Sequence, residues 1–372
     1  MESLFAWIEK VSKSRIKENK TTLACTTILI YMGIVRYLRY KNLRTLQAKY
    51  PDPQQALDDP DAAQEIYSKF FSREFPFMAR QGTEFALFKT YSIPSISRIL
   101  ASTGELVKRC PRRVEDTELI LGEMLQAYGR IENQRARNPN TPQSEMDAQW
   151  SRSQEATARL NEIHGRYPTI RNEDYLYTAA LFVTEPQSWI NRFEWRKLDV
   201  RESNAIFRIW YDVSVSMNLK NIPDSPQKLE DFKNAYAKEN VKYSASNWKC
   251  AEPTLRLLLS NLPRFLQAIG YELGLRVLPS MLDPQDAKAF QLPHAEVRWI
   301  TWCIHSLLSM RAFFIRHFLL PRSLYVVRTP FQVNTRGRLV PTFFIYKPHI
   351  YQDGYVIADL GPEKKGEGGK YR

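Results

Sequence analysis

The segment RNEDYLYTAALFV, residues 171–183, decides the fold of this chain. From Leu176 to Val183 it is apolar on nearly every side, which is typical of a helix buried at the centre of a domain. Glu173 and Asp174 stand in its first turn, where the positive end of the helix dipole favours acidic groups, and Asn172 is a candidate N-cap. We therefore predict a central buried helix that begins near Asn172.

Apolar residues recur at helical spacing on both sides of this segment. The segments with this pattern are 61–71, 84–91, 95–102, 114–128, 154–167, 188–195, 201–217 and 296–318. Asp199 is the predicted N-cap of the 201–217 helix, the early part of 131–153 with its Asn-Pro-Asn is predicted as a surface loop, and 326–360 is predicted to include short strands. Glycine is scarce, at 14 of 372 residues, and helices dominate, so the predicted fold class is all-α.

The N-terminus has the pattern of a membrane anchor. Residues 4–16 fit a short amphipathic helix, and TTLACTTILIYMGIV (21–35) carries no charge. With Tyr37 and Leu38 the apolar segment reaches 18 residues, against about 20 for a full span. A buried core helix or a signal peptide would share this pattern, but RYLRYKNLR follows without a small-residue cleavage site. The predicted organisation is a basic amphipathic N-terminus (1–20), a transmembrane anchor (21–38), a linker (39–61), one catalytic domain (62–362) and a flexible tail (363–372).

The distribution of charge favours a membrane partner over nucleic acid. The net charge is +13, and residues 1–50 hold ten Lys and Arg against three Glu. A basic cluster that borders an apolar segment is typical of a membrane interface. The sequence contains no nucleic-acid-binding motif, so no nucleic-acid partner is predicted.

The cysteines and the common catalytic motifs exclude several classes of site. Four widely spaced cysteines without a CxxC pair predict neither a disulfide framework nor a zinc ribbon. No GxSxG, GxGxxG, Walker A or HExxH motif occurs, and no histidine follows a glutamate at the spacing of di-iron helical bundles. If a metal performs redox chemistry here, a haem with one axial histidine is the most economical arrangement.

Three of the five histidines are comparable candidates for such a ligand. His164 shares one helical stripe with Leu160, Ile163 and Tyr167, and a neutral imidazole on an apolar face suits a metal ligand. His305 and His317 stand on a helix rich in Trp, Leu and Phe. A core histidine that is hydrogen-bonded to backbone would give the same pattern, so the residues alone do not choose among them.

Arg113 and Thr117 lie four residues apart and share one helix face. Arginine suits pairing with a carboxylate such as a haem propionate, and threonine can add a hydroxyl hydrogen bond. The RxxxT spacing is also common. The simpler interpretation of an isolated RxxxT is a solvated Arg and a Thr at the start of a helix.

Several linked blocks nevertheless give the sequence a specific resemblance. They are FALFKTYSIPSISRIL (85–100), RRVEDTELIL (112–121), ARLNEIHGRY (158–167), RNEDYLYTAALFV (171–183), EWRKLDVRE (194–202) and Leu-Pro-Arg (320–322). In this order they resemble the fungal MpaB-type oxygenases, whose catalytic domain is shared with bacterial latex-clearing rubber oxygenase. The resemblance covers roughly residues 62–362, together with the N-terminal anchor.

The resemblance implies a globin-like helical domain that holds haem b and cleaves or oxidises a carbon–carbon double bond in a prenylated, lipophilic secondary metabolite, with O2 as co-substrate. His164 matches the family's axial histidine, which makes it the expected metal ligand, and Arg113 and Thr117 match its Arg-x-x-x-Thr. An acidic residue upstream of the arginine is expected, with Glu84 and Glu105 as candidates. Residence in the endoplasmic reticulum membrane rests on the same resemblance. The domain is expected to face the cytosol, because the four widely spaced cysteines favour a reducing setting. The alternative is a non-catalytic, membrane-tethered helical binding or scaffold protein.

Overall fold

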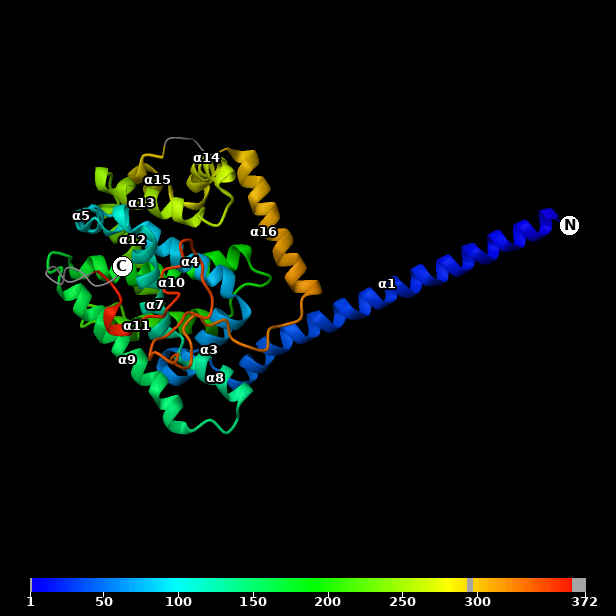
Figure 1. Ribbon diagram of the computed structural model, residues 1–372, viewed down its shortest axis with the longest axis horizontal. Helices are drawn as coiled ribbons and strands as arrows, with labels where there is room; N and C mark the ends of the chain where they lie inside the picture. Colours follow the sequence, from blue (N-terminus) through cyan, green and yellow to red (C-terminus); the bar gives the residue numbers. More distant parts are fainter. Residues whose placement is uncertain (1, 293–296, 363–372) are drawn as a thin grey trace.

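The structure is a computed structural model that describes residues 2–292 and 297–362, with side chains from Lys20 onward. His294, the predicted helix start at Glu296 and the predicted flexible tail 363–372 lie outside the described residues. Within them the chain is all-α, as predicted, and Figure 1 shows a bundle of helices from which one long N-terminal helix projects.

The helices follow one another with short connections. They are α1 (Glu2–Lys49), α2 (Gln55–Asp58), α3 (Pro60–Ser68), the π-helix η1 (Lys69–Glu74), α4 (Pro76–Thr90), α5 (Pro94–Thr103), α6 (Glu105–Lys108), α7 (Cys110–Leu125), α8 (Ala127–Arg137), α9 (Gln143–Gly165), α10 (Asn172–Phe193), α11 (Val200–Ser216), α12 (Pro226–Asn240), α13 (Ala245–Leu258), α14 (Arg264–Met281), α15 (Pro284–Phe290), α16 (Arg298–Phe318) and the 3-10 helix η2 (Ile357–Asp359).

The C-terminal segment differs from the prediction of short strands. Between Val326 and Leu360 the only pairing of strand type is one isolated bridge that joins Leu339 to Tyr355. The segment instead wraps over the helices, and its side chains bond to them: the Tyr351 hydroxyl donates to Asp116 and the Tyr355 hydroxyl to Glu123, both on α7. Its alternating pattern therefore comes from contacts with helices and not from pairing within a sheet.

Helices α4 and α10 form the central pair, which confirms the prediction of a buried helix over 176–183. Leu176, Ala180 and Leu181 are almost fully buried. Gly82 lets the two backbones approach closely, because a Cβ at that position would lie 2.5 Å from the Cα of Pro186. The predicted cap is displaced by one residue: Arg171 is the N-cap, and the Asn172 amide instead donates to the carbonyl of Lys220 at 2.9 Å.

Helix α1 is continuous through the predicted amphipathic helix and anchor, and it extends into the predicted linker as far as Lys49. Its C-terminal part belongs to the packed domain. Arg39 and Leu46 are buried, and the ring of Tyr40 stands edge-on to that of Trp195 with centroids 5.4 Å apart. The remaining residues of the predicted linker hold α2 and the beginning of α3, so the chain packs onto the domain well before residue 62.

The part of α1 from Lys20 to about Tyr31 has the properties of a membrane span. Lys20–Lys49 is the candidate span among the described helices, with a mean hydropathy of 1.4 in its most apolar window and 6% of that window buried. Leu23, Leu29 and Ile30 are each more than half exposed. Exposed apolar residues all around a projecting helix favour lipid over water as its surroundings.

The predicted surface loop in the early part of 131–153 is mostly helical. Helix α8 continues to Arg137, α9 begins at Gln143, and the turn between them holds the Asn-Pro-Asn. The polar residues that suggested a loop are partly buried and paired: the amide of Asn133 donates to the carbonyl of Tyr325 at 2.9 Å. Helix α11 begins as predicted, with Asp199 accepting a hydrogen bond from the backbone N–H of Arg201.

One buried carboxylate ties α7, α8, α9 and the C-terminal segment together. Glu123 of α7 lies 2.5 Å from the guanidinium of Arg152 on α9 and 3.2 Å from that of Arg130 on α8. The hydroxyl of Tyr355 donates to the same carboxylate at 2.6 Å. Glu123 and Arg130 have no exposed side-chain surface. Removing one partner of such a buried group leaves an uncompensated charge, at a cost of roughly 3–5 kcal/mol.

The close approach of α4 and α10 predicts a strong effect of Gly82→Ala. The added methyl group meets backbone atoms of Glu185 and Pro186, which cannot move aside as a side chain can, so we expect a loss of about 1–3 kcal/mol or more in the free energy of unfolding. Chemical denaturation followed by circular dichroism measures it.

Gly165→Ala is the matched control, since a Cβ at Gly165 has no neighbouring atom within 4 Å. It should be neutral or stabilise the helix by up to about 1 kcal/mol. Equal effects of the two substitutions would contradict the packing described for Gly82.

Candidate functional site

A cavity of about 590 Å³ lies between the helices of the domain. Its volume falls within the range of roughly 300–1,000 Å³ that is usual for sites of small molecules and cofactors. Most of its lining is aliphatic or aromatic, from α4, α5, α7, α9, α10, α13, α14 and α16. The polar and charged side chains that line it include Glu84, Arg113, Thr117, Glu118, His164, Tyr175 and Tyr346.

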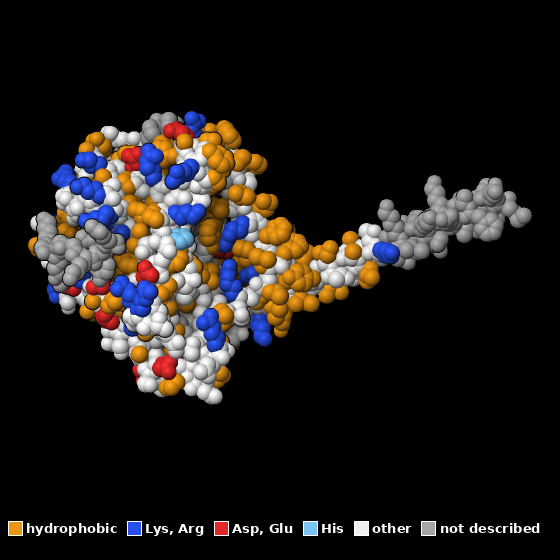
Figure 2. All heavy atoms as spheres, in the orientation of Figure 1, with side chains coloured by type: hydrophobic (Ala, Val, Ile, Leu, Met, Phe, Trp, Pro, Cys, Tyr) orange, Lys and Arg blue, Asp and Glu red, His pale blue; other side chains and the backbone are white. Residues whose placement is uncertain are grey.

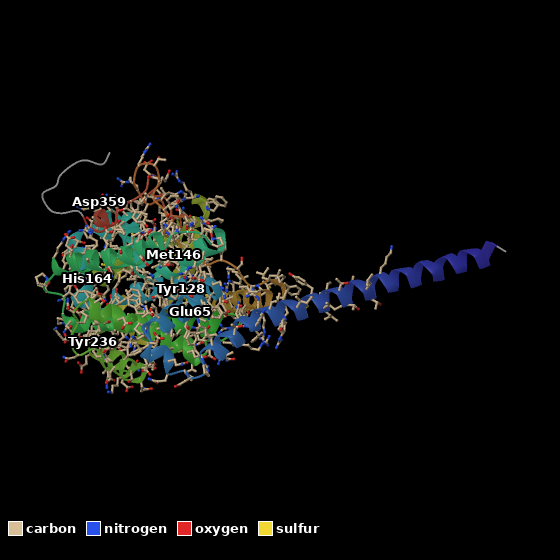
Figure 3. All side chains as sticks on the ribbon, turned by 90° about the horizontal axis from the view of Figure 1, so that it is seen from below. Glu65, Tyr128, Met146, His164, Tyr236 and Asp359 are labelled. Carbon is tan, nitrogen blue, oxygen red and sulfur yellow. The ribbon has the colours of Figure 1, made fainter. Side chains whose placement is uncertain are left out.

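The packing of α7 against α9 brings Arg113 and His164 to the same end of these helices. The Ser153 hydroxyl of α9 donates to the carbonyl of Met124 on α7 at 2.5 Å, which fixes the register of the antiparallel pair. Arg113 lies as many residues before Met124 as His164 lies after Ser153, so the register places them opposite one another. Figure 3 shows His164 on the side of the domain away from α1, whereas Met146, near the start of α9, lies nearer to α1.

His164 lies on the cavity wall in a form suited to binding a metal. Its Nδ1 is buried and has no hydrogen-bond partner, and its ring packs against that of Tyr175 with centroids 4.7 Å apart. Burial, together with repulsion from the Arg113 guanidinium, lowers the pKa of His164 to about 4. The ring is therefore neutral at physiological pH, with a lone pair on one of its two nitrogens available for coordination.

Arg113 and Thr117 share one turn at the start of α7 and both line the cavity. The Arg113 guanidinium donates to the Thr117 hydroxyl, which in turn donates to the Arg113 carbonyl at 2.8 Å. Arg113 thus brings a cation with several N–H donors to a wall that is otherwise largely apolar. Such a group can pair with the carboxylate of a ligand.

The other candidates from the sequence lie elsewhere. His305 sits beside Arg192 at 3.1 Å, and His317 packs on the ring of Phe313, with centroids 4.6 Å apart; neither is among the cavity-lining residues. Glu105 is also absent from the lining and faces Arg109 at 3.9 Å. Of the two acidic candidates, only Glu84 lines the cavity.

Glu84 belongs to a buried carboxyl pair that the sequence analysis did not find. The Tyr346 hydroxyl donates to Glu84 Oε1 at 2.6 Å and lies 3.2 Å from Glu118 Oε1. Arg80 bonds to Glu84 at 2.7 Å, and Arg328 bonds to Glu118 at 2.6 Å. Burial and repulsion from Glu84 raise the pKa of Glu118, with the two arginines opposing the shift. A raised pKa favours a proton shared within this group.

These missed residues left little trace in the sequence. Glu118 is the one with a local signal, because it follows Thr117 directly within the RRVEDTELIL block. Tyr346 and Arg328 come from the wrapped C-terminal segment, more than 200 residues further along the chain. Tyr175 lies within the central apolar block. Its hydroxyl is buried without a hydrogen-bond partner and its side chain lines the cavity.

The described residues contain no group of three or more His, Cys, Asp or Glu side chains that could chelate a metal ion, and all four cysteines are free. The cavity lining thus has one imidazole, one guanidinium and the carboxyl groups of Glu84, Glu118 and Asp174 among extensive apolar walls. This donor set fits a large planar cofactor that brings four ligands of its own to the metal and needs one more from the protein.

Comparison with known proteins gives three relatives. The chain is 30% identical over 289 residues to the ER-bound oxygenase mpaB of Penicillium roqueforti (strain FM164), covering 72% of this chain and 89% of that protein. It is 29% identical over 312 residues to the ER-bound oxygenase mpaB' of Penicillium brevicompactum (78% and 68%) and 29% identical over 251 residues to mpaB of the same species (62% and 59%). No protein-family model matches the chain.

The environment of His164 predicts an unusual titration. In the cofactor-free protein its imidazole should gain a proton only near pH 4, because the charged form is disfavoured by burial and by Arg113. Selective ¹³C labelling of histidine and NMR titration would measure the midpoint, and His164→Gln would assign the signal. A midpoint near the ordinary value of about 6.5 would show that the ring is solvated and not buried as described.

Proposed function

The chain belongs to the MpaB family of ER-bound oxygenases, and from this membership we propose that it is a membrane-anchored, haem-dependent oxygenase. The substrate class that the site supports best is a prenylated or otherwise lipophilic secondary metabolite, oxidised or cleaved at a carbon–carbon double bond. O2 is the second substrate, and haem b is the cofactor that supplies an iron centre able to activate it.

One observation carries this proposal: a neutral imidazole with a buried, unpartnered Nδ1 stands on the wall of a large apolar cavity. An unpartnered buried polar atom is costly unless a ligand satisfies it. If haem is bound, His164 would be the residue that holds its iron. Its low pKa keeps it neutral, so no proton needs to leave when the metal binds.

Arg113 is the residue in this cavity best suited to hold the acidic edge of the cofactor. Its guanidinium lines the cavity on α7, opposite His164 on α9 in the register described above. Charge-assisted hydrogen bonds from arginine to a carboxylate are about twice as strong as neutral ones. Thr117 accepts one of the guanidinium's hydrogen bonds and so restricts its orientation.

The substrate class follows from the composition of the remaining walls. Phe88, Ile96, Leu278 and Leu308 are examples of a lining that can bury an extended hydrocarbon chain. Burying apolar area contributes roughly 25 cal/mol for each Å² removed from water. The same walls exclude water from the reacting atoms.

The Glu84–Glu118 pair is proposed to hold a proton at the cavity wall. Glu118 keeps its proton to a higher pH than an ordinary glutamate, because it is buried beside Glu84. The Tyr346 hydroxyl bridges the two carboxyl groups and fixes their positions. A group with a raised pKa can act as an acid near neutral pH.

The proposed location is the endoplasmic reticulum membrane, with α1 as a single span and the catalytic domain facing the cytosol. The names of the relatives, ER-bound oxygenases, and the exposed apolar surface of α1 support the location in a membrane.

His164→Ala should abolish or grossly alter the Soret band of the purified protein and stop oxygenation, because the cavity then lacks its nitrogen ligand. His305→Ala and His317→Ala are matched controls. Neither residue lines the cavity, so both variants should keep the spectrum and lose mainly packing stability. Absorption spectroscopy with circular dichroism as a check of folding makes the comparison. An intact spectrum in His164→Ala would move the ligand elsewhere, and a protein that never shows a Soret band would favour the non-catalytic alternative.

Arg113→Ala should weaken haem retention and leave the helical content unchanged. The loss of a charge-assisted bond typically costs about 1.5–3 kcal/mol, which corresponds to roughly a 10–100-fold weaker affinity. Transfer of haem to an acceptor protein measures retention. Arg109→Ala is the control, since Arg109 caps the same helix but does not line the cavity. Unchanged retention and turnover in Arg113→Ala would remove the residue from the site.

A further inference from the structure

Helix α16 has two apolar faces, and only one of them is packed against the protein. Its inner face contributes Ile304 and Leu308 to the cavity wall. Its outer face is a continuous stripe along the helix, consisting of Trp299, Trp302, Cys303, Leu307, Met310, Phe313 and Phe314. Trp299 and Trp302 are 67% and 69% exposed, and none of the exposed positions from 299 to 314 is charged.

Helix α14 extends this apolar surface. Phe265, Ile269 and Leu273 recur every four residues on its exposed side, and Phe265 is 76% exposed. Helices α14 and α16 pack against one another. Figure 2 shows hydrophobic side chains along this edge of the domain that continue onto α1. An exposed apolar patch of this kind on a soluble protein is a strong sign of an interaction site.

The end of α16 is fastened to the anchor helix. The Tyr31 hydroxyl donates to the carbonyl of Phe318 at 2.9 Å, and the Arg39 guanidinium donates to the carbonyls of Leu319 and Leu320 at 2.6 and 3.2 Å. The carbonyls at the end of α16, which the helix itself cannot satisfy, thus receive their hydrogen bonds from α1. Figure 1 shows α16 reaching α1 where α1 leaves the domain.

This junction fixes the depth of α16 relative to the membrane. Tyr31 lies inside the uncharged segment 21–35 that is expected in the hydrocarbon, and basic residues follow it at Arg36, Lys41 and Arg44. A span of about 20 residues that begins near residue 20 ends beyond Tyr31. The C-terminal end of α16, which bonds to Tyr31, therefore lies within the half of the bilayer next to the domain when α1 crosses the membrane.

We propose that the outer face of α16, with the exposed side of α14, is a second membrane-contact surface that rests in the same leaflet that α1 enters. The occupant of this face is the lipid bilayer. Continuity with the anchor, the absence of charge among the exposed positions of α16 from 299 to 314, and the two exposed tryptophans, which favour the membrane interface, all point to it.

The surface lies beside the entrance of the cavity. Phe77, Leu258 and Leu273 line the cavity and are also 46%, 41% and 43% exposed, so they mark where it reaches the surface. Leu273 belongs to the α14 stripe, and Phe77 packs under the guanidinium of Arg311 on α16 at 4.8 Å. The entrance thus opens towards the lipid, and an apolar substrate enters from the bilayer without crossing water. This second part rests on the proposed function.

Quenching of tryptophan fluorescence tests the membrane contact directly. Full-length protein is reconstituted in phosphatidylcholine vesicles with and without bromine atoms on the acyl chains. The Trp299→Phe/Trp302→Phe variant should lose a clear part of the bromolipid quenching, and Trp150→Phe, which removes an exposed tryptophan on α9, should not. Quenching of Trp299 and Trp302 by aqueous iodide would place the face in water and overturn the proposal. Protection from both quenchers would show that a second copy or another protein covers the face, which also overturns it.

A second variant separates the surface from the anchor and from catalysis. Leu307→Glu/Met310→Glu places charge on the outer face without touching the cavity lining. It should remain in the membrane fraction through α1, lose the bromolipid quenching of Trp302, and raise the KM for a membrane-dissolved substrate several-fold with kcat unchanged. Val215→Glu, at an exposed position on α11, is the control. An unchanged KM together with lost quenching would overturn the entry of substrate from the bilayer. Absence of turnover in the unmutated protein would contradict the proposed function, but it would leave the quenching result valid.

Discussion

The Glu123 carboxylate is the constraint on which the site depends. It is fully buried, and it receives Arg130 from α8, Arg152 from α9 and Tyr355 from the C-terminal segment. A buried charge requires these partners at definite positions, whereas apolar contacts alone tolerate sliding of one helix along another. The register of α7 against α9 is set at this end, and the opposite end of the same pair consequently places Arg113 across from His164. The ion pairs of Glu123 at one end of the helix pair thereby fix the relative positions of Arg113 and His164 at the other end.

The two ends of the α7–α9 pair differ in the partners of their buried polar groups. At the Glu123 end the charged groups Glu123, Arg130 and Arg152 form ion pairs, and the segment around Thr329 and Tyr355 covers them. At the other end the buried Nδ1 of His164 and the hydroxyl of Tyr175 are left without partners. Unsatisfied buried groups are rare and costly in folded proteins, so the rest of the domain must hold them in place. A ligand that satisfies them gains affinity from that arrangement.

The sequence predicted those parts of the fold whose signal is local. Three such features can be recognised from residues within a few helical turns: the apolar block in α10, the Asp199 cap of α11 and the stripe that contains His164. The polar residues in the early part of 131–153 led to a wrong prediction, because the sequence does not distinguish a buried Asn133 from a solvated one. Its partner Tyr325 lies 192 residues further along the chain. For the same reason the residues alone do not distinguish His164 from His305 and His317 as a metal ligand. They also do not indicate that Tyr346 bridges Glu84 and Glu118.

Helix α16 shows how a site and a location in the cell can depend on one element. A helix that is apolar on one side only is explained by packing on its own domain. Helix α16 has apolar residues on both sides, with Leu308 turned to the cavity and Phe313 exposed. Carbonyls at the C-terminal end of its backbone accept hydrogen bonds from Tyr31 and Arg39 of α1, so this end cannot move relative to α1 without losing these hydrogen bonds. In the proposed membrane-bound state, α16 faces the cavity on one side and lipid on the other, and it sets the cavity at a fixed height above the membrane. The hydrophobic effect that would hold α1 in the bilayer would then also orient the entrance to the cavity.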